Sequence, residues 1–389
     1  MNLLDVLLVL MLILAGISGF RRGVALQLLS FGGLLVGLAL GAVIATPLAT
    51  LLESSAAQAW IAAITVLAAA IGGDWLGWWV GVKARTRARA SRHRRFDPPG
   101  GVALSIVASL LAIWFVGLNL VSGPSPFVAR QISGSAIVRA LDDLLPPPPS
   151  FLAEVRGFFN EFGYPDVFTG IPPAPAEPVQ PPDRTQAQHA FDAADQSTVR
   201  IVGQTCDHIE EGSGFVVATS YVVTAAHVVA GMREPQVQEQ QGESQPATVV
   251  LFDPDLDLAV LLVSGTPPPL ELANATVGRG AVGAVLGYPQ GGALVGDDAA
   301  VRARITAVGR DIYENGEVSR ELYELQAKVQ PGDSGGPFVL VDGTVAGMVL
   351  GASGADLAIS YAVTSTQIMP EVNRAIGGTR SVSTGACLR

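Results

Sequence analysis

The sequence predicts a protein of two domains: an N-terminal four-helix transmembrane domain, residues 1–123, and a C-terminal all-β double β-barrel, residues 196–389. The first domain contains four apolar stretches that are each long enough to cross a hydrocarbon core of about 30 Å. The second consists of short apolar runs separated by Gly, Pro and Asn turns, which is typical of a β-barrel. A hydrophobic content of 49% fits a membrane part joined to a soluble part.

Four apolar stretches are expected to span the membrane: Leu3–Phe20, Val24–Ala45, roughly Ala57–Val82, and Val102–Val121. A cleaved signal peptide is the alternative for the first stretch. However, Arg21 and Arg22 follow the apolar run instead of preceding it, and a second span begins at once. The loops after the first and third spans are basic, whereas the loop after the second has no basic residue. We therefore expect both chain ends to lie outside the cytoplasm.

A basic segment, Lys83–Arg95, holds seven Lys and Arg residues and no acidic one, in a chain whose net charge is −10. RNA binding is the alternative for this segment, but its position between two spans favours a role in membrane topology. Because the rest of the chain is acidic, nucleic acid is not an expected partner.

Glycines and aspartates within the apolar stretches indicate where helices pack and where charge enters the membrane part. Gly33, Gly37 and Gly41 share one helix face, where a neighbouring helix can approach closely. Asp5 and Asp74 are ionisable residues near span ends, which leaves both an ion path and simple contact with water open.

The segment between the two domains has two parts. Residues 124–170 mix apolar pairs with Pro146–Pro149, and we expect short extracytoplasmic juxtamembrane helices there. Residues 171–195 form a predicted proline-rich linker, because the six prolines between Ile171 and Asp183 are too many for a helix or a central strand. Extended backbone without hydrogen bonds is easily cut, so we expect self-cleavage between Ile171 and Gln196.

Short apolar runs predict the strands of the barrels: Thr198–Val202, Gly214–Ala218, Tyr221–Thr224, Ala247–Phe252, Ala259–Val263, Ala281–Leu286, Phe338–Val341, Val345–Leu350 and Ile359–Val363. Asn315-Gly316 and Asp342-Gly343 are hairpin signals. Gly265–Pro269 is a natural crossover between two barrels.

The segment Gly332–Pro337 reads Gly-Asp-Ser-Gly-Gly-Pro. A serine hydroxyl is a weak nucleophile, and acyl transfer needs it on a tight glycine turn whose N–H groups face the carbonyl oxygen under attack. The N–H groups of Gly332 and Ser334 are therefore the candidate oxyanion hole. Upstream lie His227, in Thr-Ala-Ala-His-Val, and three carboxylates that compete to orient it: Asp253, Asp255 and Asp257.

In this order, His then Asp then Ser, the segments resemble the chymotrypsin clan of serine proteases, and most closely its bacterial HtrA-like branch. The resemblance implies a double barrel of chymotrypsin-like type, with Ser334 as nucleophile, His227 as base and Asp257 as the acid that orients it. It also implies a specificity pocket formed by Lys328, Val329, Gln330, Gly347, Met348, Ser360 and Tyr361. Lys328 stands where trypsin-like enzymes keep an acid, which argues against a preference for basic side chains.

A second reading of the first strand is possible. Arg200-Ile201-Val202-Gly203 looks like a trypsin zymogen cleavage site, whose new Ile amino terminus would pair with Asp333. However, Gly212-Ser213-Gly214-Phe215 matches the HtrA-like opening, and the spacing from Ile201 to His227 is shorter than trypsins use. We interpret Thr198–Val202 as the first strand.

Asp5, Arg21-Arg22-Gly23 and the glycine-ridged second span resemble the colicin V production family. The whole arrangement resembles the actinobacterial membrane-associated acid-resistance serine proteases. That resemblance implies an extracytoplasmic endopeptidase that processes cell-envelope proteins under acid or oxidative stress. Two alternatives stay open: a pseudo-protease that senses the envelope, and a four-span scaffold or transport component regulated by its protease domain.

Cys206 and Cys387 are the only two cysteines, and neither has a metal-ligand neighbour, so we expect no metal and no cofactor. The topology places both outside the cytoplasm, where thiols oxidise, and we predict a disulfide between them. The bond would serve either as a structural staple or as a redox control of activity.

Overall fold

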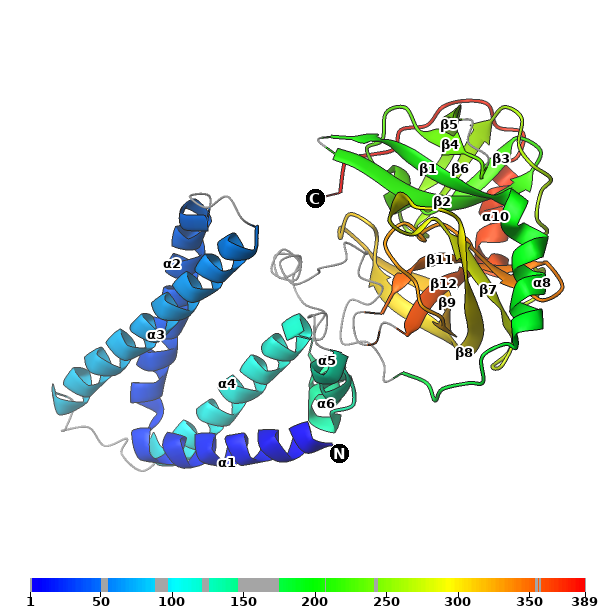
Figure 1. Cartoon of the computed structure of the whole chain (residues 1–389). Helices are drawn as coiled ribbons and strands as arrows, with labels where there is room; N and C mark the ends of the chain where they lie inside the picture. Colours follow the sequence, from blue (N-terminus) through cyan, green and yellow to red (C-terminus); the bar gives the residue numbers. More distant parts are fainter. Residues whose placement is uncertain are drawn as a thin grey trace. The chain divides into compact units, whose positions relative to one another are not determined.

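The computed structural model describes residues 2–49, 55–87, 97–120, 126–145, 175–206, 208–240, 244–353, 356 and 358–388 (Figure 1). The chain divides into two compact units. The first comprises Met1–Leu118 and Gly134–Leu145, and the second comprises Asn119–Ser133 and Pro146–Arg389.

The first unit is helical. Its helices are α1 (Leu3–Arg22), α2 (Val24–Ala49), α3 (Ser55–Arg87), α4 (Asp97–Leu120) and α6 (Ala136–Leu144). Within the described residues, a helix therefore covers each predicted span. Within the described residues, two helical segments are long and apolar enough to cross a membrane, Leu3–Arg22 and Pro98–Leu118. Spanning by α2 and α3 stays a prediction.

Helices α2 and α3 pack against each other through glycine. A Cβ atom on Gly33 would collide with the carbonyl oxygen of Gly73, and one on Gly37 would collide with that of Ala69. This is the close approach predicted from the four-residue glycine spacing, and the facing helix supplies Gly73 and Gly77 to the same contact.

Asp5 has a structural use in the first unit. Its carboxylate accepts hydrogen bonds from the Ser135 hydroxyl at 2.6 Å and from the backbone N–H groups of Ala136 and Ile137 at 3.3 and 3.2 Å. These N–H groups lie at the start of α6, where a helix leaves its donors unpaired. Asp5 thus joins α1 to α6, and this contact accounts for an acid in an apolar helix.

Between the domains, the structure has α5 (Pro126–Ser133) and α6 in the predicted juxtamembrane segment, while residues 146–174 lie outside the described residues. The linker prediction for residues 171–195 is wrong in its second half, because Arg184–Ala194 forms helix α8. Asp183 caps this helix by accepting a hydrogen bond from the N–H of Gln186, and a 3₁₀ turn, η1 (Asp195–Ser197), follows it.

Before helix α8, two of the described linker residues, Ala176 and Val179, are hydrogen-bonded to the second barrel. The N–H of Ala176 donates to Glu324 at 2.9 Å and the N–H of Val179 donates to Gln326 at 3.0 Å, while Arg302 donates to the carbonyl of Ala176. The self-cleavage prediction assumed exposed backbone without hydrogen bonds. That assumption does not hold at Ala176 and Val179 or within helix α8, but Glu177, Pro178, Gln180, Pro181 and Asp183 are exposed.

The second unit contains two closed six-stranded barrels (Figure 1). The first barrel has β1 (Thr198–Thr205), β2 (His208–Ala218), β3 (Tyr221–Thr224), β4 (Gln236–Gln238), β5 (Ser244–Asp253) and β6 (Leu258–Val263), in the order β1-β2-β3-β6-β5-β4. The second has β7 (Val282–Gly287), β8 (Val295–Arg310), β9 (Glu317–Gln326), β10 (Pro337–Leu340), β11 (Val345–Ala352) and β12 (Ile359–Thr364), in the order β10-β11-β12-β9-β8-β7. All nine predicted strands are present.

Strands β4, β8 and β9 were not predicted, although Asn315-Gly316 does lie in the β8–β9 turn as expected. Two short helical segments, α9 (Ala226–Val229) and η2 (Pro289–Gly291), follow β3 and β7. Helix α10 (Ser365–Ala375) follows β12 and packs on strands of both barrels.

Two buried strands, β3 and β6, position the residues of the candidate site. In β3 every residue is buried, and in β6 all but one are, because both strands lie in the core of the first barrel. They pair so that Thr224 lies opposite Ala259. His227 follows the end of β3 and Asp257 precedes the start of β6, so this pairing brings the two loops together.

The prediction that Thr198–Val202 forms the first strand agrees with the structure. Ile201 is fully buried in β1 and is paired with Gly212 of β2 and Val237 of β4. The predicted disulfide between Cys206 and Cys387 is also present.

Candidate active site

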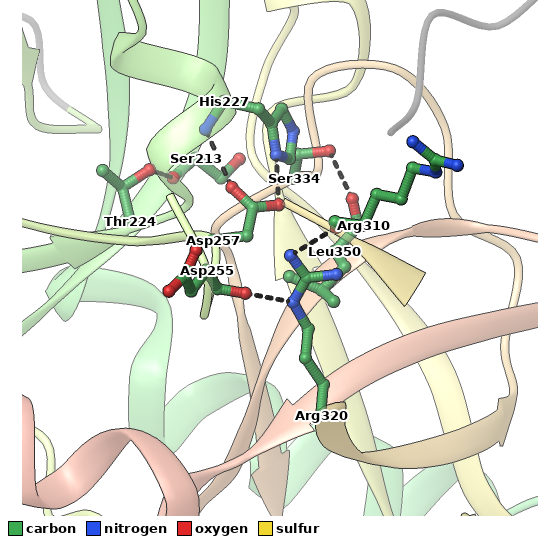
Figure 2. A network of polar contacts seen from close by, with 9 residues as sticks. All are labelled: Ser213, Thr224, His227, Asp255, Asp257, Arg310, Arg320, Ser334 and Leu350. Carbon is green, nitrogen blue, oxygen red and sulfur yellow. Dashed lines mark hydrogen bonds and ion pairs between the residues drawn. The ribbon is translucent and has the colours of Figure 1, made fainter. Parts of the chain in front are cut away.

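His227 and Asp257 form a closely bonded pair. The imidazole Nδ1 lies 2.7 Å from Oδ2 of Asp257, and the backbone N–H of His227 donates to Oδ1 of the same carboxylate at 2.8 Å (Figure 2). A carboxylate only accepts, so Nδ1 carries the proton and the other ring nitrogen, Nε2, is left as the basic atom.

The structure gives the three competing carboxylates different positions. Oδ1 of Asp253 accepts the N–H groups of Asp255 and Leu256 at 2.9 and 3.0 Å and so closes the turn. Asp255 is exposed. Asp257 contacts His227, is 2% exposed, and has a φ of 56°, a left-handed conformation that is costly for a residue with a Cβ.

A buried arginine, Arg320 of β9, lies behind this pair, and sequence reasoning missed it. Its Nε donates to the carbonyl oxygen of Asp255 at 2.7 Å. Burial by itself would raise the pKa of Asp257, but the charge and hydrogen bonds of His227, together with the Arg320 guanidinium, hold that pKa below its usual value.

Ser334 lies in the loop between β9 and β10 and is 4% exposed. Figure 2 shows its side chain beside those of His227 and Asp257. Its hydroxyl donates to the carbonyl oxygen of Leu350 at 3.0 Å. To be activated by His227 the hydroxyl must turn from that carbonyl toward Nε2, and such bonds often form only when substrate is bound.

The backbone around Ser334 leaves two donors unused. Within the described part of the chain, the N–H groups of Gly332 and Ser334 donate to no protein acceptor. The carbonyl oxygen of Pro331 accepts from the N–H of Gln290 at 2.7 Å. Because the two polar groups of a trans peptide point in opposite directions, this bond aims the Gly332 N–H away from Gln290. Two backbone N–H groups without a protein acceptor are what an oxyanion hole requires.

Ser213 holds this loop, and it is a second residue that sequence reasoning missed. Its hydroxyl donates to the carbonyl oxygen of Gly332 at 2.6 Å and accepts from the N–H of Tyr288 at 2.9 Å. Its own N–H donates to the carbonyl oxygen of Ser334 at 2.8 Å. Ser213 is fully buried on β2, so one residue of the first barrel fixes the loop of the second.

Comparisons with known proteins agree with this architecture. Residues 212–348 match the trypsin-like peptidase domain family, and residues 4–146 match the Colicin V production protein family. Serine protease Rv3671c of Mycobacterium tuberculosis is 33% identical over 99% of this chain and 98% of its own. The chain belongs to this family of serine proteases. A crystal structure of the Rv3671c protease in an active form is 37% identical and covers 55% of this chain and 96% of its own, with a TM-score of 0.53.

A more distant relative shows the HtrA-like character of the serine protease half. A probable periplasmic serine endoprotease, DegP-like, from Chlamydia pneumoniae is 33% identical over 40% of this chain and 32% of its own. The Colicin V match and the two apolar helical segments indicate that the serine protease is associated with a membrane.

The proposed specificity pocket is placed only in part. Lys328 is exposed, and its charge acts on the carboxylate of Asp297. Met348 is fully buried in the core, and a Cβ on Gly347 would collide with the carbonyl of Val363. Neither residue is exposed in the described structure, and a role of Gly347 and Met348 in the specificity pocket stays a prediction.

Of the other predicted pocket residues, one is partly exposed and three are buried. Gln330 is partly exposed, Val329 is 4% exposed, Ser360 is fully buried and Tyr361 is 5% exposed. Burial raises the pKa of Tyr361 to about 12, so its hydroxyl stays protonated.

Asp333, beside the proposed nucleophile, is a buried acid. It is 4% exposed, and its Oδ2 accepts from the N–H of Gln330 at 2.8 Å. Burial raises the pKa of Asp333 to about 7; the Gln330 bond opposes this rise and the charge of Asp297 adds to it. Ile201, the partner that zymogen activation would supply, is held inside β1.

Proposed function

We propose that the protein is a membrane-tethered extracytoplasmic serine endopeptidase that uses His227, Asp257 and Ser334 as a catalytic triad. The observation that carries the proposal is the Asp257–His227 hydrogen bond of 2.7 Å, which leaves Nε2 as the basic atom of the imidazole. The family relationship to serine proteases supports it.

In this mechanism Ser334 Oγ transfers its proton to Nε2 of His227 and attacks the scissile carbonyl. The unused N–H groups of Gly332 and Ser334 bind the negative charge that forms on the carbonyl oxygen. Asp257 stabilises the resulting imidazolium ion, which then gives its proton to the leaving amine. A water molecule then gives its proton to His227 and attacks the acyl-enzyme in the same way, which releases the acid product and restores Ser334.

The membrane half is proposed to cross the bilayer four times, with both termini and the protease domain outside the cytoplasm. The basic loops support this orientation, and the helices over all four apolar stretches are compatible with it. The proposed substrates are cell-envelope proteins, which the enzyme would cleave under acid or oxidative stress. The lipid bilayer is the other proposed partner, and no nucleic acid is expected to bind. Self-cleavage is proposed between Ile171 and Gln196, where several described residues before helix α8 are exposed.

Labelling of the full-length protein with a fluorophosphonate probe tests the proposal. We expect covalent modification of Ser334, loss of labelling in Ser334→Ala and His227→Asn, and a fall of several orders of magnitude in peptide hydrolysis by both. Ser383→Ala, which removes an exposed serine of the tail, is the matched control and should label like the wild type. A folded wild-type protein that does not label would favour the envelope-sensor alternative.

A further inference from the structure

Arg320 joins the two barrels behind the proposed triad. It lies on β9 of the second barrel and is 4% exposed. Its guanidinium donates from Nε to the carbonyl oxygen of Asp255 at 2.7 Å and from Nη2 to that of Arg310 at 3.0 Å (Figure 2). A rigid fork of this kind fixes two segments relative to each other, here the loop that carries Asp257 and the end of β8.

The carbonyl group of Asp255 that Arg320 binds lies two residues before Asp257. Asp257 has a left-handed φ of 56°, which costs free energy and persists only where the surroundings impose it. Asp253 holds the turn from one side through the N–H groups of Asp255 and Leu256. Arg320 holds it from the other side, through a carbonyl group that no side chain of the first barrel binds among the described residues.

Arg320 is also the cation that faces the triad acid. Four carboxylates act on its guanidinium: Asp257, Asp255 and Asp253 from the β5–β6 loop, and Asp311 from the β8–β9 turn. Burial lowers the pKa of Arg320 and these carboxylates raise it, and an arginine stays charged in either case. The neighbouring Arg310 side chain points away and donates to the carbonyl of Glu314 at 2.8 Å.

We propose that Arg320 is a positioning residue of the triad, one that fixes the orientation of Asp257 and whose charge offsets part of the attraction between Asp257 and the imidazolium ion of His227. This rests on the proposed function of His227, Asp257 and Ser334. The imidazolium ion forms beside the negative charge of Asp257, and a cation behind that carboxylate offsets part of the attraction. Replacement of Arg320 would strengthen that attraction, so the acid limb of the activity profile should move to higher pH.

The pH profile of kcat/KM for a peptide substrate tests this, with the full-length protein in detergent between about pH 5 and pH 9. In Arg320→Met the acid limb should move to higher pH by about half a unit to one unit, a loss of about three- to tenfold on the acid side beyond any change at the plateau. The plateau itself should fall by about tenfold because the Asp257 loop is no longer held.

Two further variants separate charge from packing. Arg320→Lys keeps the charge but not the fork, so its plateau should fall while its acid limb stays at the wild-type pH. Arg304→Met removes an equal charge from the exposed arginine of β8, whose Nη1 donates to Thr276 at 2.8 Å, and should leave the profile unchanged.

An acid limb that does not move in folded Arg320→Met overturns the proposal, as does an equal movement in Arg304→Met. Where Arg320→Met fails to fold, Arg320→Lys decides: a displaced acid limb in that variant overturns the proposal, and an unmoved limb with a lower plateau supports it. Failure of the proposed function has a different signature, because the wild-type protein would then show no hydrolysis and no labelling of Ser334.

Discussion

Replacement of Ser213 by alanine should impair catalysis although Ser213 contacts no substrate in the proposed mechanism. The change removes the hydroxyl that donates to Gly332 and accepts from Tyr288, at 2.6 and 2.9 Å, in a place with no solvent access. Each buried group left without a partner costs about 1 to 3 kcal/mol, so we expect a loss of about 2 to 4 kcal/mol in the free energy of unfolding.

The effect on the reaction follows from the position of Gly332. Its φ of 101° is open to glycine alone, and the Ser213 hydroxyl fixes the carbonyl on its far side. Without that bond the loop can tilt and displace the Gly332 N–H from the oxyanion. Complete removal of one such donor costs a factor of about 10² to 10³ in kcat, and a displaced donor should cost about 10 to 100.

The assay is steady-state peptide hydrolysis by the full-length protein, with unfolding followed in denaturant. In Ser213→Ala we expect kcat to fall and KM to change little, since the lost interaction forms in the transition state. Ser365→Ala is the matched control: Ser365 is also buried, its hydroxyl donates to the carbonyl of Val345 at 2.6 Å, and its loss should lower stability with kcat within about twofold of wild type. Wild-type kcat in folded Ser213→Ala would refute the reasoning.

Two further predictions concern stability. The pKa of Asp333 is raised from 3.8 to about 7, so the free energy of unfolding of the wild type should rise as the pH falls from about 7 toward 4. In Asp333→Asn the free energy of unfolding should exceed that of the wild type by up to about 4 kcal/mol at pH 8 and by little near pH 4. Equal differences at the two pH values would contradict this. The Cys206→Ser/Cys387→Ser variant removes a disulfide between residues 181 apart, and its free energy of unfolding should fall by up to about 5 kcal/mol. Its turnover should persist where it stays folded, because Thr384 still forms hydrogen bonds with Gly231 and Met232. Loss of turnover in the folded variant would instead favour redox control.

The sequence predicted the elements whose signal is local. Apolar runs of four to six residues between turn residues identified nine strands, and the crossover at Gly265–Pro269 assigned His227 and Asp257 to the first barrel and Ser334 to the second, as in the structure. Strands β8 and β9 were missed because charged residues interrupt them: Arg302, Arg304, Arg320 and Glu324 all lie within strands. Arg302 and Glu324 pair with each other at 3.2 Å, which allows these charges to be buried.

The linker was mispredicted for a related reason. Its prolines do exclude a regular strand, but they do not exclude binding of the backbone by side chains from elsewhere in the chain. Glu324 and Gln326, almost 150 residues further on, supply the acceptors for the N–H groups of Ala176 and Val179. Local composition therefore predicted extended backbone before Arg184 correctly, but it could not predict that part of this backbone is hydrogen-bonded to β9.

The residues that sequence reasoning missed at the site share one property, which is that each acts between segments far apart in the chain. Ser213 ties β2 to the Ser334 loop, and Arg320 ties β9 to the Asp257 loop. Tyr313 adds a third connection: its hydroxyl lies 3.1 Å from the carbonyl oxygens of Thr384 and Ala386, in the tail that the disulfide fastens. Motifs identify groups that carry out chemistry because their spacing recurs, whereas residues that hold those groups in register depend on the folded topology. Variants at these connections therefore test how the two barrels form one site, a question that substitution of the triad itself cannot address.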